Sequence, residues 1–208
     1  GFAVYDDWLP RGRGAGSRAY VERRADDTTT RVLGWLDERA QKNRAGAPVR
    51  PWFLWVHYFD PHAAYEPPPE FAARFPNSAY DGEIAFVDTQ LGRLLQRLER
   101  GGELARTVVL VTADHGESLG DHGEQTHGIF VYDATLRVPF IIAGPGIPAG
   151  LTPRVVARGV DVMPTLLDFA GLEAAGLDGR SLRPALDGES MPDAPVYVEG
   201  LVAARHLG

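Results

Sequence analysis

Residues 108–117 read Val108-Val109-Leu110-Val111-Thr112-Ala113-Asp114-His115-Gly116-Glu117. The apolar and β-branched run has no polar alternation, which is typical of a strand buried on both faces in a parallel sheet covered by helices. Open α/β sheets bind ligands at the carboxyl ends of their strands, and Asp114 and His115 stand at such an end. Gly116 allows the chain to turn away sharply. The stretch therefore predicts an α/β fold with a carboxylate and an imidazole at one sheet edge.

Further elements are predicted on both sides of this strand. The apolar run 52–57 indicates a second buried strand, and a capping box at Ser78 precedes a helix with one apolar stripe over 84–98. Strand, helix and strand form the βαβ unit of a parallel sheet. The other predicted elements are a helix from about Arg24, strands at 138–143, 154–157 and 196–199, and a helix after Asp161 that stops at Gly171. The predicted fold class is α/β, with a mostly parallel sheet flanked by helices.

Composition limits the kinds of partner and cofactor. The 208 residues suffice for one α/β domain, and the net charge of -7 argues against nucleic acid or an anionic membrane as the main partner. Without cysteine, a metal would be held by oxygen and imidazole, which suits Ca, Mg, Mn or Zn. No apolar run approaches the ~20 residues of a membrane span. Residues 1–18 are aromatic and then Gly/Arg-rich, which predicts an irregular start.

Candidate functional side chains follow two of the predicted strands and continue into a loop rich in Gly, His and acidic residues at 117–128. They are His57, Asp60 and His62, then Asp114 and His115, then His122 and His127. A divalent cation at this edge would polarise an ester oxygen and neutralise a bound oxyanion. Asp114 offers an oxygen ligand, and His115 a nitrogen ligand if its other ring nitrogen is oriented by a neighbour.

A purely structural interpretation is also open for several of these residues. Asp114 could cap the following turn, His62 could be a surface histidine, and His57 is more simply a structural histidine at a strand end. Asp60 is most simply a turn residue before Pro61. Four members of the loop fit a loop-shaping role better than a ligand role: Glu117, Asp121, His122 and Glu124.

Five segments of the chain occur in an order and at spacings that a known family shares. They are W-F-L-W-V-H-Y-F-D-P-H from residue 52, Y-D-G-E-I-A-F-V-D-T-Q-L-G-R-L-L from residue 80, V-V-L-V-T-A-D-H-G-E-S-L-G-D-H-G from residue 108, T-H-G-I-F-V-Y-D-A-T-L-R-V-P-F-I-I from residue 126, and V-D-V-M-P-T-L-L-D-F-A-G-L from residue 160. Together they resemble the sulfatase family of the alkaline phosphatase-like superfamily, over about residues 22–199.

This resemblance implies a sulfuric ester hydrolase with one divalent metal and a formylglycine nucleophile made from Cys or Ser. Asp114 and His115 match two of the family's metal ligands, with Ca²⁺ favoured and Mn²⁺, Mg²⁺ and Zn²⁺ as alternatives. His62 matches a histidine that contacts the sulfate or assists the leaving group, and His127 a position, often Lys, that places a cation on the sulfate oxygens. Arg137 matches a structural position. The implied substrate is a small-molecule or carbohydrate sulfate ester.

The family's upstream Asp-Asp ligand pair and its nucleophile segment are absent. We expect them to precede Gly1, so that residues 1–208 are the carboxyl-side part of a catalytic domain, inactive alone and compatible with a periplasmic or secreted location. Two alternatives stay open. One is a phosphodiesterase, phosphonate hydrolase or phosphoglycerol transferase of the same superfamily. The other is a relic that binds metal without catalysis.

Overall fold

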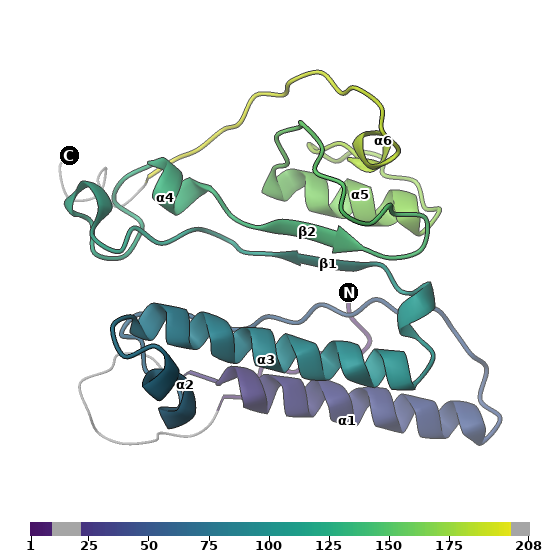
Figure 1. The fold of residues 1–208 in the computed structure, drawn as a ribbon. Helices are drawn as coiled ribbons and strands as arrows, with labels where there is room; N and C mark the ends of the chain where they lie inside the picture. The colour runs from purple at the N-terminus through teal and green to yellow at the C-terminus, as the bar shows by residue number, and fades with distance from the viewer. Residues whose placement is uncertain (10–21, 201–208) are drawn as a thin grey trace. The chain divides into compact units, whose positions relative to one another are not determined.

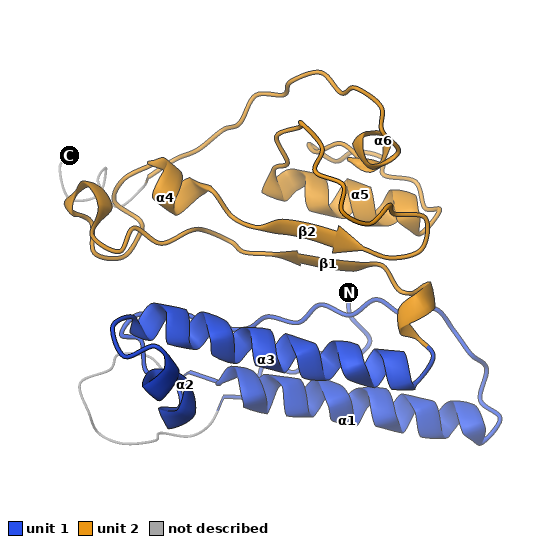
Figure 2. Cartoon of the chain, viewed as in Figure 1, with its two compact units in different colours: residues 1–102 blue, residues 103–208 orange. Residues whose placement is uncertain are grey.

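The computed structural model of the chain describes residues 1–9 and 22–200 (Figure 1). It divides into two compact units, residues 1–102 and residues 103–208 (Figure 2). Of the irregular start predicted for 1–18, residues 1–9 contain neither helix nor strand, and the rest lies outside the described residues. Within the described ranges, no helix is long and apolar enough to cross a membrane.

The first unit is built on three helices: α1 (Ala25–Arg44), α2 (Pro69–Arg74) and α3 (Ala79–Arg100). The helix α1 lies alongside α3 (Figure 1). The apolar stripes of these helices meet in a core that includes Ala25, Phe71 and Phe86. Both long helices begin near the residues that the sequence predicted, and the Ser78 Oγ accepts a hydrogen bond from the Asp81 amide at 3.2 Å, as expected of an N-cap.

The predicted strand at 52–57 is wrong within the described residues. This segment has no described strand partner, and its residues alternate between exposed and half-buried. Phe53 and Trp55 remain 57% and 70% exposed. A continuous apolar run predicted burial of both faces, but only one face is covered here. His57 at its end is exposed.

The second unit contains a two-stranded sheet of β1 (Val109–Thr112) and β2 (Phe140–Ala143), with Val109 opposite Ala143. Its helices are η1 (Leu104–Arg106), η2 (Asp121–Gly123), α4 (Asp133–Leu136), η3 (Gly159–Asp161), α5 (Val162–Phe169) and α6 (Arg183–Leu186).

The two strands run antiparallel, which corrects the prediction of a mostly parallel sheet for this pair. The reason is the connection: parallel neighbours need a crossover that carries a long element, usually a helix. The chain between β1 and β2 contains only the short η2 and α4. The βαβ unit that the sequence predicted is not formed by the described residues either, because its first strand, at 52–57, is absent.

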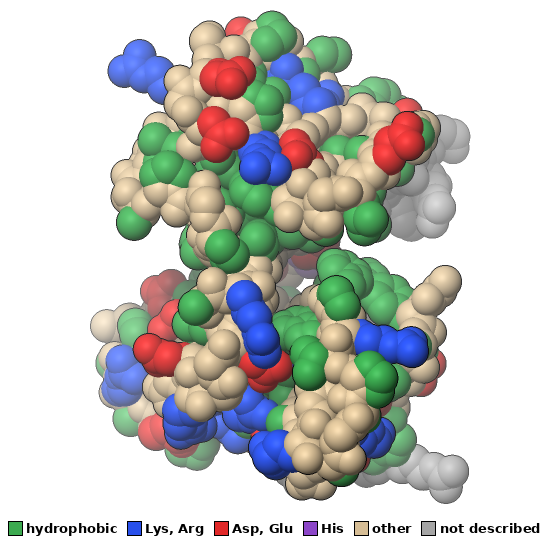
Figure 3. All heavy atoms as spheres, turned by 90° about the vertical axis from the view of Figure 1, so that its right-hand side faces the viewer, with side chains coloured by type: hydrophobic (Ala, Val, Ile, Leu, Met, Phe, Trp, Pro, Cys, Tyr) green, Lys and Arg blue, Asp and Glu red, His purple; other side chains and the backbone are tan. Residues whose placement is uncertain are grey.

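The short strands predicted at 154–157 and 196–199 are not formed. Val156 and Val196 are both 52% exposed, so these β-branched residues lack the paired, half-buried surface that favours strands. Apolar side chains reach the surface in each of the two units (Figure 3). The helix predicted after Asp161 is confirmed as α5, although the Asp161 side chain does not cap it.

Candidate functional site

The turn after β1 is fixed by a close backbone contact at Gly116. Its amide donates a hydrogen bond of 2.8 Å to the carbonyl of Thr135, which belongs to α4. A Cβ at Gly116 would lie 2.1 Å from the Ala134 carbonyl oxygen, far inside van der Waals contact. Only glycine therefore allows this approach, and the approach fixes the position of the two residues before it.

We expect Gly116→Ala to lower the free energy of unfolding by about 3 kcal/mol, the upper part of the range for overpacking, because the colliding atom belongs to rigid backbone. Gly159→Ala is the control, since a Cβ there meets nothing within 4 Å. Urea denaturation followed by circular dichroism measures both. Equal stability of the two variants would show that the turn can move away from α4.

Asp114 and His115 present a carboxylate and an imidazole together. The His115 Nδ1 lies 2.8 Å from the Gly116 carbonyl, which can only accept, so Nδ1 carries the proton and a neutral ring keeps its lone pair on Nε2. That Nε2 lies 3.7 Å from the Asp114 Oδ2, and the Asp114 side chain is 79% exposed. An oxygen and an oriented nitrogen fit a divalent cation such as Ca²⁺, Mn²⁺, Mg²⁺ or Zn²⁺.

These two donors do not complete a metal site. Among the residues that the structure describes, no cluster of three or more acidic, His or Cys side chains is arranged to hold a cation. Metal sites in proteins use about three to six protein ligands. Asp114 and His115 alone are therefore too few to hold a cation.

His127 is brought to the same place. Its ring stacks on that of His115, with centroids 3.7 Å apart and an interplanar angle of 29°. Its Nδ1 faces the Glu117 Oε1 at 3.3 Å, and the Glu117 side chain is only 6% exposed. The second unit thus gathers Asp114, His115 and His127, three of the four residues matched to family roles. Glu117, predicted as loop-shaping, orients His127.

The rest of the loop is held by its own polar groups. The buried Glu124 carboxylate accepts hydrogen bonds from the amides of Ile129 at 2.8 Å and Phe130 at 3.1 Å. The His122 Nδ1 lies 3.1 Å from the Asp121 Oδ1. The His122 ring stacks on Tyr132, with centroids 3.6 Å apart. These contacts agree with the loop-shaping roles that the sequence predicted.

His62, the fourth predicted site residue, belongs to the first unit. Its Nδ1 lies 2.7 Å from the Ala63 carbonyl and therefore donates to it, so a second, transferable proton would be on Nε2. The Glu22 Oε1 is 3.8 Å from the same Nδ1. The ring also lies against Phe59, with centroids 4.3 Å apart.

Glu83 of α3 positions the His62 loop, and sequence reasoning missed it. Its buried carboxylate accepts hydrogen bonds from the amides of His62 at 3.0 Å and Glu66 at 2.6 Å. Burial raises the pKa of Glu83 above its ordinary value, although these two hydrogen bonds oppose the shift. The available signal was a charged residue on the buried stripe of α3, one helical turn before Phe86.

Asp60 also has a defined structural role. Its Oδ2 accepts a hydrogen bond from the Ala25 amide at 2.7 Å and so satisfies the first turn of α1. Burial raises the pKa of Asp60, and the Ala25 amide and the nearby Arg24 oppose that shift. The sequence predicted only a turn residue because the partner is distant along the chain.

Comparison with known proteins decides the family. The Sulfatase family model matches residues 12–172, which is most of the chain.

The chain belongs to the sulfatase family. An N-acetylglucosamine-6-O-sulfatase of Bacteroides thetaiotaomicron is 41% identical over 117 residues, which cover 55% of this chain and 21% of that protein.

Solved structures of the sulfatase type are similar in fold. A Bacteroides fragilis protein described as a sulfatase, yidJ, superposes with a TM-score of 0.70 at 20% identity, over 80% of this chain and 42% of that one. A phosphonate monoester hydrolase of Silicibacter pomeroyi has a TM-score of 0.60 at 28% identity, over 92% of this chain and 49% of that one. The alkaline phosphatase-like fold class is thereby confirmed at the level of the family. The present chain spans only about a fifth of the curated sulfatase and under half of each solved chain.

Proposed function

We propose that the protein carrying this sulfatase chain hydrolyses sulfate esters. The observation that supports this most is the arrangement after β1, where the Asp114 carboxylate and the His115 Nε2 are 3.7 Å apart and His127 stacks on His115. In this proposal Asp114 and His115 are two ligands of a divalent metal, Ca²⁺ by preference. The proposal requires further ligands and a formylglycine nucleophile, which the described residues do not supply.

In this proposal the candidate site residues have separate tasks. A bound metal would polarise the ester and neutralise charge on the sulfate. The Gly116 carbonyl holds the His115 ring so that Nε2 faces the metal side. His127, oriented by Glu117, donates a hydrogen bond to a sulfate oxygen and carries a positive charge when it is protonated. His62 holds a proton on Nε2 for the leaving oxygen, a role suited to imidazole near neutral pH.

The organic part of the substrate is assigned only by class. The similarity to an N-acetylglucosamine-6-O-sulfatase supports a carbohydrate or small-molecule sulfate ester. A second candidate is phosphonate or phosphodiester hydrolysis, because the similarity to a phosphonate monoester hydrolase covers 92% of the chain.

The test compares both ester types in the protein that carries the whole catalytic domain. With Ca²⁺ or Mn²⁺ present, we expect kcat/KM for an aryl sulfate to exceed that for the matching aryl phosphonate monoester by at least about tenfold, or about 1.4 kcal/mol of transition-state stabilisation. The opposite preference would assign the protein to the second candidate. Metal binding without hydrolysis of either ester would show that the protein binds metal but has no catalytic activity.

A further inference from the structure

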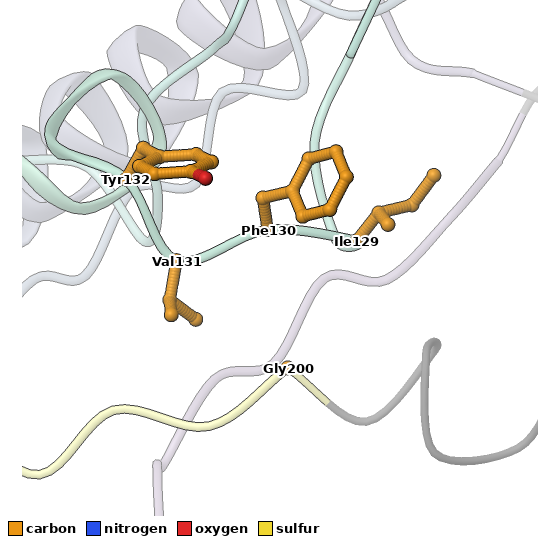
Figure 4. Close-up of a pocket in the computed structure, with 5 residues that line it drawn as sticks. All are labelled: Ile129, Phe130, Val131, Tyr132 and Gly200. Carbon is orange, nitrogen blue, oxygen red and sulfur yellow. The ribbon is translucent and has the colours of Figure 1, made fainter. Parts of the chain in front are cut away.

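A cavity of about 290 Å³ in the second unit is bordered by side chains that do not converge. Its lining consists of Ile129, Phe130, Val131, Tyr132 and Gly200. Figure 4 shows the Phe130 and Tyr132 rings on the opposite side of the backbone from Val131 and Gly200. Buried polar groups converge instead in the first unit, around the loop that carries His62.

The His62 loop, residues 62–66, lies against the first turns of α3. The Tyr65 ring packs edge-on against Tyr80, with centroids 5.3 Å apart and an interplanar angle of 76°. A Cβ at Gly82 would lie 2.9 Å from the Pro67 Cγ, so this glycine allows the chain after the loop to approach the helix closely. The loop is therefore placed by contacts with α3 at two points.

Glu83, the next residue of α3, binds both ends of the loop. Its Oε2 accepts a hydrogen bond from the His62 amide at 3.0 Å, and its Oε1 accepts one from the Glu66 amide at 2.6 Å. Glu83 is 4% exposed, so water competes little for either oxygen. Hydrogen bonds to a charged acceptor are roughly twice as strong as those between neutral groups. A single carboxylate thus ties the backbone of the loop to α3.

The negative charge of Glu83 allows it to hold two amides at once. Burial raises its pKa, the Glu66 and His62 amides oppose that rise, and the Asp60 and Glu22 carboxylates add to it. An ionised carboxylate has only acceptor oxygens, whereas a glutamine side chain has one oxygen and a nitrogen that donates. Glu83→Gln therefore keeps one of the two amide contacts and turns the other into two facing donors.

The His62 ring follows the backbone that Glu83 holds. Its Nδ1 donates to the Ala63 carbonyl at 2.7 Å, and the ring lies against Phe59 with centroids 4.3 Å apart. Both neighbours belong to the same short stretch of chain. A shift of the His62 amide would therefore carry the ring and its Nε2 with it.

We propose that Glu83 is a positioning residue that acts through His62, the proton donor proposed above. Its carboxylate holds the loop so that the Nε2 proton reaches the leaving oxygen as the bond between that oxygen and sulfur breaks. The proposal rests on the ester hydrolysis proposed above and adds to it a residue that touches neither substrate nor metal. A catalytic group displaced by about 1 Å costs on the order of a hundredfold in rate, so loosening of this loop is measurable.

The experiment compares two sulfate esters that differ in how much their leaving oxygen needs a proton, using the protein that carries the whole catalytic domain. The oxygen of phenyl sulfate is strongly basic as it leaves, whereas that of 4-nitrophenyl sulfate is weakly basic. We expect Glu83→Gln to lower kcat about thirtyfold for phenyl sulfate and less than about threefold for 4-nitrophenyl sulfate. His62→Ala should show the same selectivity, with a loss of about a hundredfold for phenyl sulfate. The double variant should be no slower than His62→Ala, because both changes remove one function.

Two further variants separate positioning from a general loss of structure. Gly82→Ala places a methyl group against Pro67 and leaves the carboxylate intact, so it should give the same selectivity in milder form. Gln90→Met is the control, since Gln90 is a 5% exposed polar residue of α3 that binds Arg93 at 2.6 Å. It should change kcat for the two esters by equal factors. Circular dichroism melting confirms the folding of each variant.

Hydrogen exchange of residues 62–66, followed by mass spectrometry, tests the loop itself without reference to activity. These amides should exchange about tenfold faster in Glu83→Gln than in the wild type, and no faster in Gln90→Met. Equal losses of kcat for both esters in Glu83→Gln would overturn the positioning role while ester hydrolysis stands. If the wild type hydrolyses neither ester, the proposed hydrolysis fails. Faster exchange in Glu83→Gln then keeps Glu83 as the group that holds the His62 loop, and unchanged exchange overturns that role too.

Discussion

Asp114→Ala should reduce kcat/KM for sulfate ester hydrolysis roughly a thousandfold, because in the proposed mechanism it removes an oxygen ligand from a metal that would contribute several kcal/mol to the transition state. The change should cost little stability. The Asp114 side chain is largely exposed, and its contacts are a hydrogen bond from the neighbouring His115 amide and the His115 ring. Loss of activity with retained folding is therefore the expected combination.

Steady-state kinetics and metal content measure this effect together. Asp133→Ala is a matched control, since Asp133 lies nearby in α4 with an exposed carboxylate paired only loosely to Arg137 at 3.9 Å. It should leave kcat/KM unchanged. Chelation of the wild-type metal should reproduce the Asp114→Ala defect, and added Ca²⁺ or Mn²⁺ should restore the wild type alone. Full activity in Asp114→Ala would remove Asp114 from the ligand set.

Asp161→Asn should lower the free energy of unfolding by about 3 kcal/mol, as for breaking a buried ion pair. The Asp161 carboxylate is fully buried. It accepts hydrogen bonds from the Arg158 amide, Nε and Nη2 at 2.8–3.0 Å and from the Arg180 amide at 3.0 Å. An asparagine amide turns one of these oxygens into a donor that faces other donors.

The same carboxylate makes the loss depend on pH. Burial alone would raise the pKa of Asp161, but the Arg158 side chain and the two amides lower it more, so the net pKa lies below its ordinary value of 3.8. A lowered pKa gives stability that is complete above the ordinary value and disappears as pH falls through the lowered one. The difference in free energy of unfolding between wild type and Asp161→Asn should thus be constant above about pH 5. It should shrink as the pH falls below about 4.

Urea denaturation across this pH range is the measurement. Asp168→Asn is the control, because Asp168 also pairs with an arginine, Arg183 at 3.1 Å, but its side chain is 36% exposed. An exposed pair contributes about 1 kcal/mol or less. Equal losses of unfolding free energy in the two variants would contradict a larger contribution from the buried Asp161 carboxylate.

Local sequence patterns predicted the elements whose partners are close along the chain. The helix α3 followed from the cap at Ser78 and one apolar stripe, and α5 from its first turn and the glycine after it. The grouping of Asp114, His115 and His127 was predictable for the same reason, since one strand and one loop carry all three.

Features that depend on distant partners could not be predicted in this way. A strand at 52–57 requires a neighbouring strand, and its apolar sequence does not specify one. The antiparallel pairing of β1 with β2 depends on the path of the loop between them. Glu83 and Asp60 bind amides 21 and 35 residues away, a relation that no local pattern contains.

Thr135 holds both the turn after β1 and the backbone of the neighbouring run 129–132. Its carbonyl accepts the Gly116 amide, and its hydroxyl holds the backbone of the run 129–132. Among the described residues, the hydrogen bonds of Glu124 and Thr135 that fix this run all use its main-chain atoms. The side chains of Ile129, Phe130 and Val131 can therefore be exchanged during evolution without loosening the turn that carries Asp114 and His115. Such a scaffold is evolvable: its apolar surface can change while the neighbouring turn keeps its geometry.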